Sequence, residues 1–296
     1  MLGNNKRNIG MNALTQNTDA WLELRKRKIG ASDAPIIMGM SPWKTPYKLW
    51  AQKVGIDNEN IVTQAMQNGI DKEQEAREEF MRMTNMDVAP RVCFHENLDW
   101  MMASLDGIDK TNKHIVEIKN AGLPDHTIAK NGKIPEKYFP QLQHQLEVTG
   151  LDMAYYFSYR HGEGAIVEVG RDQKFIDEML REEKKFFACM QDFVAPKMST
   201  KDYVTIDDYE CTKAAEELKS VLQNIATLTK REEDIKKALT DMCEAKGLNN
   251  ASCGGIHISR CVRKGTIDYA GIPELKKIDL EMFRKAPISY WRVKNS

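Results

Sequence analysis

The sequence predicts an α+β fold that is followed by a helical extension. Short segments rich in β-branched and aromatic residues occupy much of 88–169, and stretches with helical spacing lie before and after them. After about position 195 the pattern changes to apolar residues spaced by four and three. We therefore expect a flexible N-terminus over 1–18, a mixed core over 19–195 and a C-terminal extension over 196–296.

Composition excludes several classes of protein. The 296 residues are 42% hydrophobic and 29% charged, which is an ordinary globular mixture rather than that of a disordered or collagen-like chain. No apolar run approaches the roughly 18 residues of a membrane span and no signal-like segment opens the chain, so we expect a cytoplasmic protein without a membrane partner. The six cysteines form no C-x-x-C pair, which argues against zinc and iron–sulfur sites.

Helix signals mark the N-terminal part of the core. Ser32 is placed to cap a short helix that Gly39 ends. Thr45-Pro46 opens a second helix that stops at Gly55. A longer helix is predicted over 61–83, where apolar residues recur with loose helical spacing among many charged ones.

After this helix, the spacing of the apolar residues changes to the two-residue alternation of strands. Three short strands form a predicted meander: 88–95, 100–105 and 114–119. Beyond them a helix is predicted over 138–148, with Pro140 in its first turn and Gly150 at its end. Two further strands and a helix complete the core: 153–159, 165–169 and 173–194.

The C-terminal extension carries one apolar seam. Nine positions from Ala214 to Met242 are spaced alternately by four and three residues, and Glu232 is the one polar member. The seam predicts a single long helix over about 209–247, or a helical hairpin broken near Thr229. Packing of this stripe within the chain is favoured over self-association.

The tail over 248–296 is basic although the whole chain is not. Lys plus Arg and Asp plus Glu both number 43, whereas ten Lys or Arg and four acids between Lys246 and Ser296 give this segment a net charge of +6. Basic and aromatic groups are interleaved there, which suits a phosphate backbone. Three residues are candidate contacts for DNA: Arg260, Arg263 and Lys264. A solvated basic face explains the same pattern equally well.

Two carboxylates and one lysine fall on neighbouring predicted strands. Asp106 ends one strand, and Glu117 and Lys119 lie on the next. Residues two apart on a strand share a face, and the meander brings Asp106 beside them. Such a set suits Mg²⁺, with the carbonyl of Ile118 between the acids, while Lys119 would hold or deprotonate the attacking water. On spacing alone, a surface ion pair on a hairpin is the better explanation.

Two more features extend this set. Glu73, on the preceding predicted helix, offers the third carboxylate that a second metal position requires, although a solvated glutamate explains it as well. Tyr138, Gln141 and Gln145 fall on one face of a later helix. A glutamine face of this kind is usually exposed to solvent.

Six motifs follow one another between about Ala20 and Tyr159. They are Trp21-Leu-Glu-Leu-Arg25, Ile29-Gly-Ala-Ser32, Gly69-x-x-x-Glu73, Ser104-x-Asp106-Gly107, Glu117-Ile-Lys119 and Tyr138-x-x-Gln141-x-Gln143-His144-Gln145. In this order they resemble the YqaJ-like viral recombinase family, the lambda-exonuclease group within the PD-(D/E)xK nuclease superfamily. The resemblance implies a restriction-endonuclease-like core, a mixed central sheet flanked by helices.

The resemblance also implies an activity and a set of roles. Family members degrade one strand of duplex DNA from a 5′ end with Mg²⁺, for which Mn²⁺ substitutes, at a two-metal site. By motif position Asp106 and Glu117 would be metal ligands, together with the Ile118 carbonyl, and Glu73 would be the helical acid near the metals. Lys119 would be the catalytic lysine and Gln141 a helper.

A second set of residues corresponds to the family's site for the terminal 5′-phosphate: Arg25, Ser32 and Ser104. The predicted N-cap position of Ser32 favours an anion, and the Arg25 guanidinium is a suitable phosphate fork. Without the motif order, capping alone and a surface ion pair with Glu23 would be preferred. Trp21 is expected to pack the first helix rather than to touch DNA.

The sequence departs from the family pattern at two places. Leu105 stands where many members have proline, which we expect to matter little, and Asn120-Ala121 follows the lysine where Cys-Pro is common. The roughly 100 residues after Ala195 lie outside the resemblance. They are open to interpretation as a DNA clamp, an oligomer contact or a docking site for a partner.

Three functions are compatible with these observations. The leading hypothesis is a recombination exonuclease that resects duplex ends for a single-strand annealing protein and forms a ring, a trimer by family resemblance, with a locally positive channel. An endonuclease of DNA repair is less favoured because it has no terminal phosphate to hold. A non-cleaving DNA-binding recombination mediator is least favoured because the acids and Lys119 are all present.

Overall fold

The computed structural model describes residues 16, 18–57, 64–263, 265–266, 272–273, 275 and 278, and of 64–71 the backbone alone. The chain divides into two compact units, Met1–Val204 and Thr205–Ser296. Of the N-terminus predicted over 1–18, only Gln16 and Thr18 lie within the described residues.

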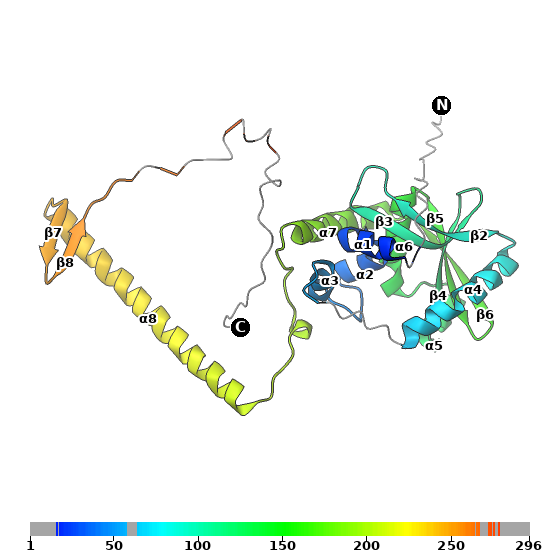
Figure 1. Cartoon of the computed structure of the whole chain (residues 1–296), viewed down its shortest axis with the longest axis horizontal. Helices are drawn as coiled ribbons and strands as arrows, with labels where there is room; N and C mark the ends of the chain where they lie inside the picture. The colour runs from blue at the N-terminus through cyan, green and yellow to red at the C-terminus, as the bar shows by residue number, and fades with distance from the viewer. Residues whose placement is uncertain are drawn as a thin grey trace. The chain divides into compact units, whose positions relative to one another are not determined.

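A six-stranded mixed sheet organises the first unit (Figure 1). Its strands are β1 (Ile29–Gly30), β2 (Val88–Phe94), β3 (Met101–Asp109), β4 (Ile115–Asn120), β5 (Met153–Arg160) and β6 (Glu163–Gly170). The predicted meander is confirmed in β2, β3 and β4, which are antiparallel; β1 and β5 run parallel to β3 and β4, and β6 returns antiparallel to β5. The parallel pair of β4 and β5 requires a crossover, which α5 (Leu123–Lys130) and α6 (Phe139–Thr149) supply.

The helices cover both faces of this sheet. Besides α5 and α6 they are α1 (Asp19–Arg27), α2 (Ala34–Ile37), α3 (Pro46–Lys53), α4 (Gln64–Thr84) and α7 (Gln173–Gln191), with short 3₁₀ turns at η1 (Ala31–Asp33), η2 (Glu136–Tyr138) and η3 (Thr200–Asp202). On one face, the Phe80 ring of α4 lies 5.4 Å from the Phe157 ring, centroid to centroid. On the other, Leu142 and Leu146 of α6 and Ile176 of α7 are fully buried in a second cluster. The predicted mixed sheet flanked by helices is confirmed.

Several helix ends follow their local sequence signals. The Thr45 hydroxyl accepts a hydrogen bond from the Lys48 N–H at 3.2 Å and caps α3. Pro140 lies in the first turn of α6, where its missing N–H costs nothing, and Gly150 ends that helix with a φ of 69°. These predicted boundaries are confirmed, whereas α5 was not predicted.

The predicted cap at Ser32 is wrong. Ser32 lies inside η1, and the Asp33 carboxylate accepts the Gly30 N–H at 2.9 Å in its place. The helix that follows, α2, is four residues long. The Ser32 hydroxyl instead accepts a hydrogen bond from the Arg25 guanidinium. Ser32 therefore does not cap α2.

The predicted end of a strand at Asp106 is also wrong, because β3 continues through it. Between the pairs Ala89–Ile108 and Arg91–Leu105 the register shifts, so that β3 carries one residue more than β2. Asp106 and Gly107 of β3 thus lie opposite the single residue Pro90 of β2, a β-bulge at a position where β2 has no N–H to donate. A bulge bends the strand and changes the direction of its side chains without ending the pairing.

Within its described residues, the second unit has one long helix and a small hairpin. α8 (Tyr209–Ala245) is continuous, so the alternative of a break near Thr229 is wrong. It is followed by the two-stranded sheet of β7 (Asn250–Cys253) and β8 (Ile256–Ser259). The predicted seam buries none of its residues in the described part of this unit, and Leu228 is 62% exposed. No described helix has the length and apolar character that a membrane span requires.

We predict that Gly107→Ala destabilises the first unit by about 1–3 kcal/mol, the usual cost of overpacking. A Cβ at this position would lie 2.7 Å from Val116 Cγ1 and 2.9 Å from Val88 Cγ2, inside the closely packed sheet. Urea denaturation measures the effect. Gly170→Ala is the matched control, since a Cβ there meets nothing within 4 Å. Equal urea midpoints for the two variants would contradict the close approach at Gly107.

Candidate active site

The Asp106 carboxylate joins the bulged strand to its neighbour. The antiparallel pairing of β3 with β4 consists of Gly107–Val116 and Ile108–Ile115. Just past these pairs, Asp106 Oδ2 accepts the Ile118 N–H at 2.8 Å. A side-chain oxygen thus satisfies a backbone donor that would otherwise need a strand partner. This contact places Asp106 beside the Glu-x-Lys segment, as its sequence position predicts.

Glu117 is a buried carboxylate with three side-chain donors. It is 1% exposed, and its Oε1 accepts from Lys119 Nζ and from Gln141 Nε2, the latter at 2.6 Å. Its Oε2 accepts from Gln145 Nε2. The expected solvent exposure of the glutamine face is therefore wrong, because both amides turn inward from α6 to hold one charge. Gln145 belongs to the motif, but the resemblance assigned it no role; its hydrogen bond to Glu117 makes it a member of this site.

The charges of this group act on one another. Burial raises the pKa of Asp106 well above its ordinary value, and the carboxylates of Glu117 and Glu73 raise it further, whereas Lys119 acts in the opposite direction. Burial alone would lower the pKa of Lys119, but Glu117 and Asp106 outweigh it and leave this pKa raised. Lys119 is therefore held as an ammonium, which is a donor rather than a base.

Glu73 reaches this cluster through an arginine that sequence reasoning missed. The Arg77 guanidinium, one helical turn further along α4, forms an ion pair with Glu73 Oε1. Its Nε also donates to the Asp106 carbonyl at 2.8 Å, so the side chain ties α4 to the bulge. The sequence did contain a signal for this contact, since an acid and an arginine four residues apart on a helix lie on the same face and can form an ion pair. Arg77 is 8% exposed.

The oxygen donors of this cluster fit a divalent cation that prefers oxygen. Asp106 and Glu117 come from adjoining strands. Burial and, after it, the Glu117 charge raise the pKa of Asp106, and a bound cation would offset both effects. Glu73, the third carboxylate, is occupied by Arg77. Across the described part of the chain, no three side chains of His, Cys, Asp or Glu gather closely enough to hold a metal ion.

The three predicted phosphate contacts meet around Trp21. The Arg25 guanidinium donates to Ser32 Oγ, and its Cζ lies 5.0 Å from the centroid of the Trp21 ring. Trp21 Nε1 in turn donates to Ser104 Oγ at 3.0 Å. The indole is 5% exposed, so it packs as expected, but it also links Arg25 and Ser32 with Ser104. This link between α1 and β3 was not predicted.

A buried lysine fixes the loop that carries this group. Lys53 Nζ lies 2.6 Å from Asp33 Oδ2 and donates to the Arg25 and Lys28 carbonyls, both at 2.8 Å. Burial lowers the pKa of Lys53, and Asp33 opposes that effect. Burial would raise the pKa of Asp33, but Lys53 and Arg25 keep it below its ordinary value. The ion pair and the two carbonyl contacts hold the end of α1 against η1.

The remaining predicted site residues lie in the second unit. Arg260 and Arg263 follow β8 and are exposed. The Arg260 N–H donates to the Asn249 carbonyl at 2.8 Å, which extends the hairpin by one bond. Lys264 lies outside the described residues.

A mixed sheet with an acid on a bulged strand, Glu-x-Lys on the next strand and helices on both faces defines a PD-(D/E)xK-like core. Within it, residues 20–152 match the YqaJ-like viral recombinase domain. The chain is 31% identical over 175 residues to the uncharacterised protein YqaJ of Bacillus subtilis (strain 168). That match covers 57% of this chain and 55% of the relative, so the chain spans about half the length of the curated relative.

Solved structures agree with this assignment. An alkaline exonuclease from Laribacter hongkongensis is 25% identical, with a TM-score of 0.52, and the match covers 60% of this chain and 94% of the exonuclease. The same exonuclease in complex with dAMP matches at 25% identity with a TM-score of 0.53, over the same shares of the two chains. The first unit of this chain thus has the fold of that exonuclease.

We predict that Lys53→Met destabilises the first unit by about 3–5 kcal/mol, because it leaves the Asp33 carboxylate buried without its cation. The side chains of this pair are 6% and 5% exposed. Thermal and urea unfolding measure the loss. Lys26→Met is the matched control: its partner is Glu23, both side chains are more than half exposed, and we expect a change of at most about 1 kcal/mol. A similar small loss in both variants would refute a structural role for Lys53.

Proposed function

We propose that this protein is a metal-dependent deoxyribonuclease that degrades one strand of duplex DNA from its 5′ end and leaves a 3′ single strand. The observation that carries the proposal is the closeness of two clusters on β3. Ser104, in the Trp21 group, and Asp106, in the acid cluster, are two residues apart on this strand. At the rise of an extended strand that separation is about 7 Å. A terminal phosphate at the first cluster puts the next phosphodiester near the second, which favours release of mononucleotides.

The acid cluster supplies the chemistry of phosphodiester hydrolysis. Asp106, Glu117 and the Ile118 carbonyl would hold Mg²⁺, or Mn²⁺ in its place, and the bound metal orients water and offsets charge on the phosphate. A second metal would draw on Glu73. The Lys119 ammonium donates to the attacking water or to a phosphate oxygen, and Gln141 with Gln145 keeps the Glu117 carboxylate in position.

The Trp21 group supplies the preference for an end. Arg25 presents a planar fork that matches two phosphate oxygens. The hydroxyls of Ser32, which accepts from Arg25, and of Ser104, which accepts from the Trp21 indole, are further donors. An endonuclease has no terminal phosphate for such a group to bind, which makes that alternative weaker. Intact Asp106, Glu117 and Lys119 argue against a non-cleaving recombination mediator.

The biological setting follows from this activity. An enzyme that exposes a 3′ single strand serves recombination by strand annealing, so a single-strand annealing protein is the expected partner in the cytoplasm. We propose a homo-oligomeric ring, a trimer, around the duplex, with Arg260 and Arg263 as contacts to the DNA backbone. Such a ring needs positive charge only in its channel, which a chain with 43 basic and 43 acidic residues can provide.

The decisive experiment is a time course on linear duplex DNA labelled at one 5′ or one 3′ end, with and without a 5′-phosphate, beside a closed circle. We expect early release of the 5′ label as mononucleotides in Mg²⁺, faster with the phosphate, and no reaction on circles or in chelator. Cutting of circles or internal fragments would replace the exonuclease by an endonuclease. DNA that is retained but never shortened would indicate a binding protein.

Lys119→Ala should reduce cleavage by at least about 100-fold, because it removes a positioned donor in a buried site. Binding of the duplex end in chelator should stay close to that of the unchanged protein. Lys113→Ala is the matched control, since Lys113 is an exposed lysine just before β4. Initial rates of mononucleotide release measure both variants. Cleavage by Lys119→Ala at the rate of the control would exclude Lys119 from the mechanism.

A further inference from the structure

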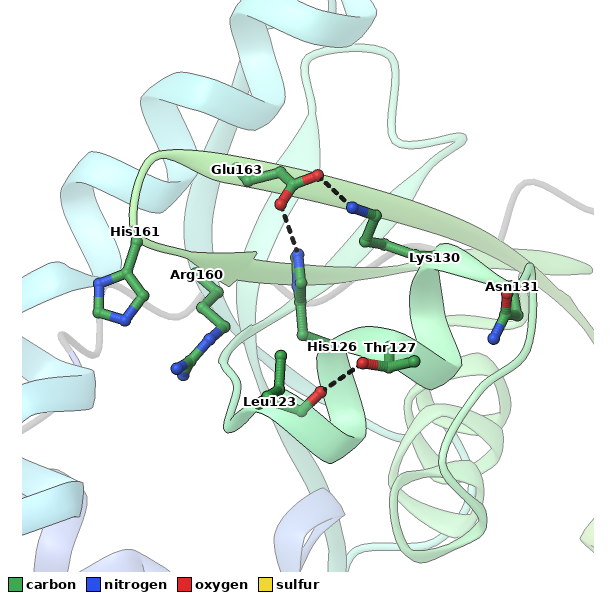
Figure 2. A pocket seen from close by; sticks show the side chains of 8 residues that line it. All are labelled: Leu123, His126, Thr127, Lys130, Asn131, Arg160, His161 and Glu163. Atoms are coloured by element: carbon green, nitrogen blue, oxygen red, sulfur yellow. Dashed lines mark hydrogen bonds and ion pairs between the residues drawn. The ribbon is translucent and has the colours of Figure 1, made fainter.

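A basic pocket at the same end of the sheet as Lys119 takes no part in the roles assigned above. It has a volume of about 340 Å³ and lies between α5 and the hairpin of β5 and β6. Four of the side chains that line it carry, or on protonation acquire, a positive charge: His126, Lys130, Arg160 and His161. Glu163 is the carboxylate among its lining residues (Figure 2). The balance of charge in the pocket favours an anion.

His126 has a buried ring nitrogen in this pocket that makes an ion-pair contact but no hydrogen bond. The side chain is 3% exposed, and its Nδ1 lies 2.9 Å from Ser158 Oγ. In the tautomer whose Nδ1 accepts from the Ser158 hydroxyl, the proton is on Nε2. Among the described residues Nε2 has no hydrogen-bond partner, and it points toward Glu163, 3.6 Å away (Figure 2). In that tautomer Nε2 is a buried donor whose contact with Glu163 is too long for a hydrogen bond, which is rare in folded proteins, and an anionic oxygen closer to it would accept one.

The other cations are placed to bind the same acceptor. Lys130 Nζ lies 2.6 Å from Glu163 Oε1, so Lys130 and His126 both reach toward one carboxylate (Figure 2). Arg160 donates from one nitrogen to the Ala121 carbonyl at 3.3 Å, and a guanidinium has five N–H groups in all. The turn between β5 and β6, His161–Gly162, has φ values of 48° and 82°, as a tight hairpin turn requires.

The pocket lies at the same end of the sheet as Lys119. β4 and β5 are parallel, so their carboxyl ends meet at one edge, which is where open sheets of this kind bind ligands. Lys119 is the register partner of Ser158, and Ser158 contacts His126. A strand of nucleic acid that passes the acid cluster at this edge would bring its neighbouring phosphates to the pocket.

We propose that this pocket binds a phosphate group, with Arg160, Lys130 and His126 Nε2 as donors, and that Glu163 occupies the place of the phosphate while none is bound. The inference rests on the proposed nuclease function and adds a second phosphate contact to it. Two sources have this chemistry: a phosphodiester of the DNA backbone and the phosphomonoester of a released mononucleotide. In either case Arg160 and Glu163 have opposite effects on phosphate affinity, because Arg160 attracts the phosphate and Glu163 competes with it.

The test measures binding of a labelled, 5′-phosphorylated duplex to the full chain in chelator, by fluorescence anisotropy at several salt concentrations. Arg160→Gln should weaken binding by about tenfold, as expected for the loss of a charge-assisted hydrogen bond, and should lower the slope of log affinity against log salt by about one. Glu163→Gln should strengthen binding several-fold. Lys174→Gln, an exposed lysine of α7, is the charge-matched control and should change neither quantity.

A second experiment identifies the source of the phosphate: a deoxynucleoside 5′-monophosphate is titrated into the protein and its binding is measured by calorimetry. A smaller slope of log affinity against log salt in Arg160→Gln assigns the pocket to the DNA backbone. Weaker binding of the mononucleotide, with this slope unchanged, assigns the pocket to the released product. Unchanged binding of both probes in Arg160→Gln and Glu163→Gln would overturn the proposal. If the unchanged protein shortens DNA in Mg²⁺ and the two variants bind both probes as it does, only the pocket assignment fails. If the unchanged protein does not shorten DNA, the proposed nuclease function fails as well.

Discussion

The charge of Glu117, buried between β4 and α6, is the constraint on which much of the first unit depends. A carboxylate that is 1% exposed would be very unfavourable without partners, because burial removes its hydration. Lys119 and the amides of Gln141 and Gln145 supply those partners. Two of the three come from α6, so the same hydrogen bonds hold this helix against the sheet and stabilise the buried carboxylate.

The rest of α6 follows from that attachment. All ten residues from Pro140 to Thr149 are buried, although several are polar. Gln143 Nε2 donates to the Gly170 carbonyl at 2.8 Å, and His144 lies 2.7 Å from Glu183 of α7 and 2.9 Å from the Met102 carbonyl of β3. A helix of this composition is stable in the core because each long polar side chain finds a partner there. The helix that holds Glu117 is thereby itself tied to β6, α7 and β3.

How much of this was predictable depends on the range of the interaction. Caps, turns and strand periods act within a few residues, and so Thr45, Gly150 and the meander of β2 to β4 were predicted correctly. The inward turn of Gln141 and Gln145 was missed because polarity alone predicts exposure, and the charge that reverses this lies on a strand more than 20 residues away. The same holds for the link from Trp21 to Ser104, which are 83 residues apart. The motif order selected residues that the fold brings into two clusters, but only packing shows which of them touch.

The connection between the acid cluster and the basic pocket has a structural basis in Tyr138. Lys119 Nζ lies 5.4 Å from the centroid of the Tyr138 ring, and the Tyr138 hydroxyl donates to Asp125 of α5 at 3.3 Å. Burial raises the pKa of Tyr138 to about 12, so this hydroxyl remains a donor at neutral pH. Asp125 also pairs with Lys137 at 2.8 Å. The helix that carries His126 and Lys130 is therefore attached, through Asp125, to the ring that lies against Lys119, so the acid cluster and the basic pocket are joined by one continuous set of contacts.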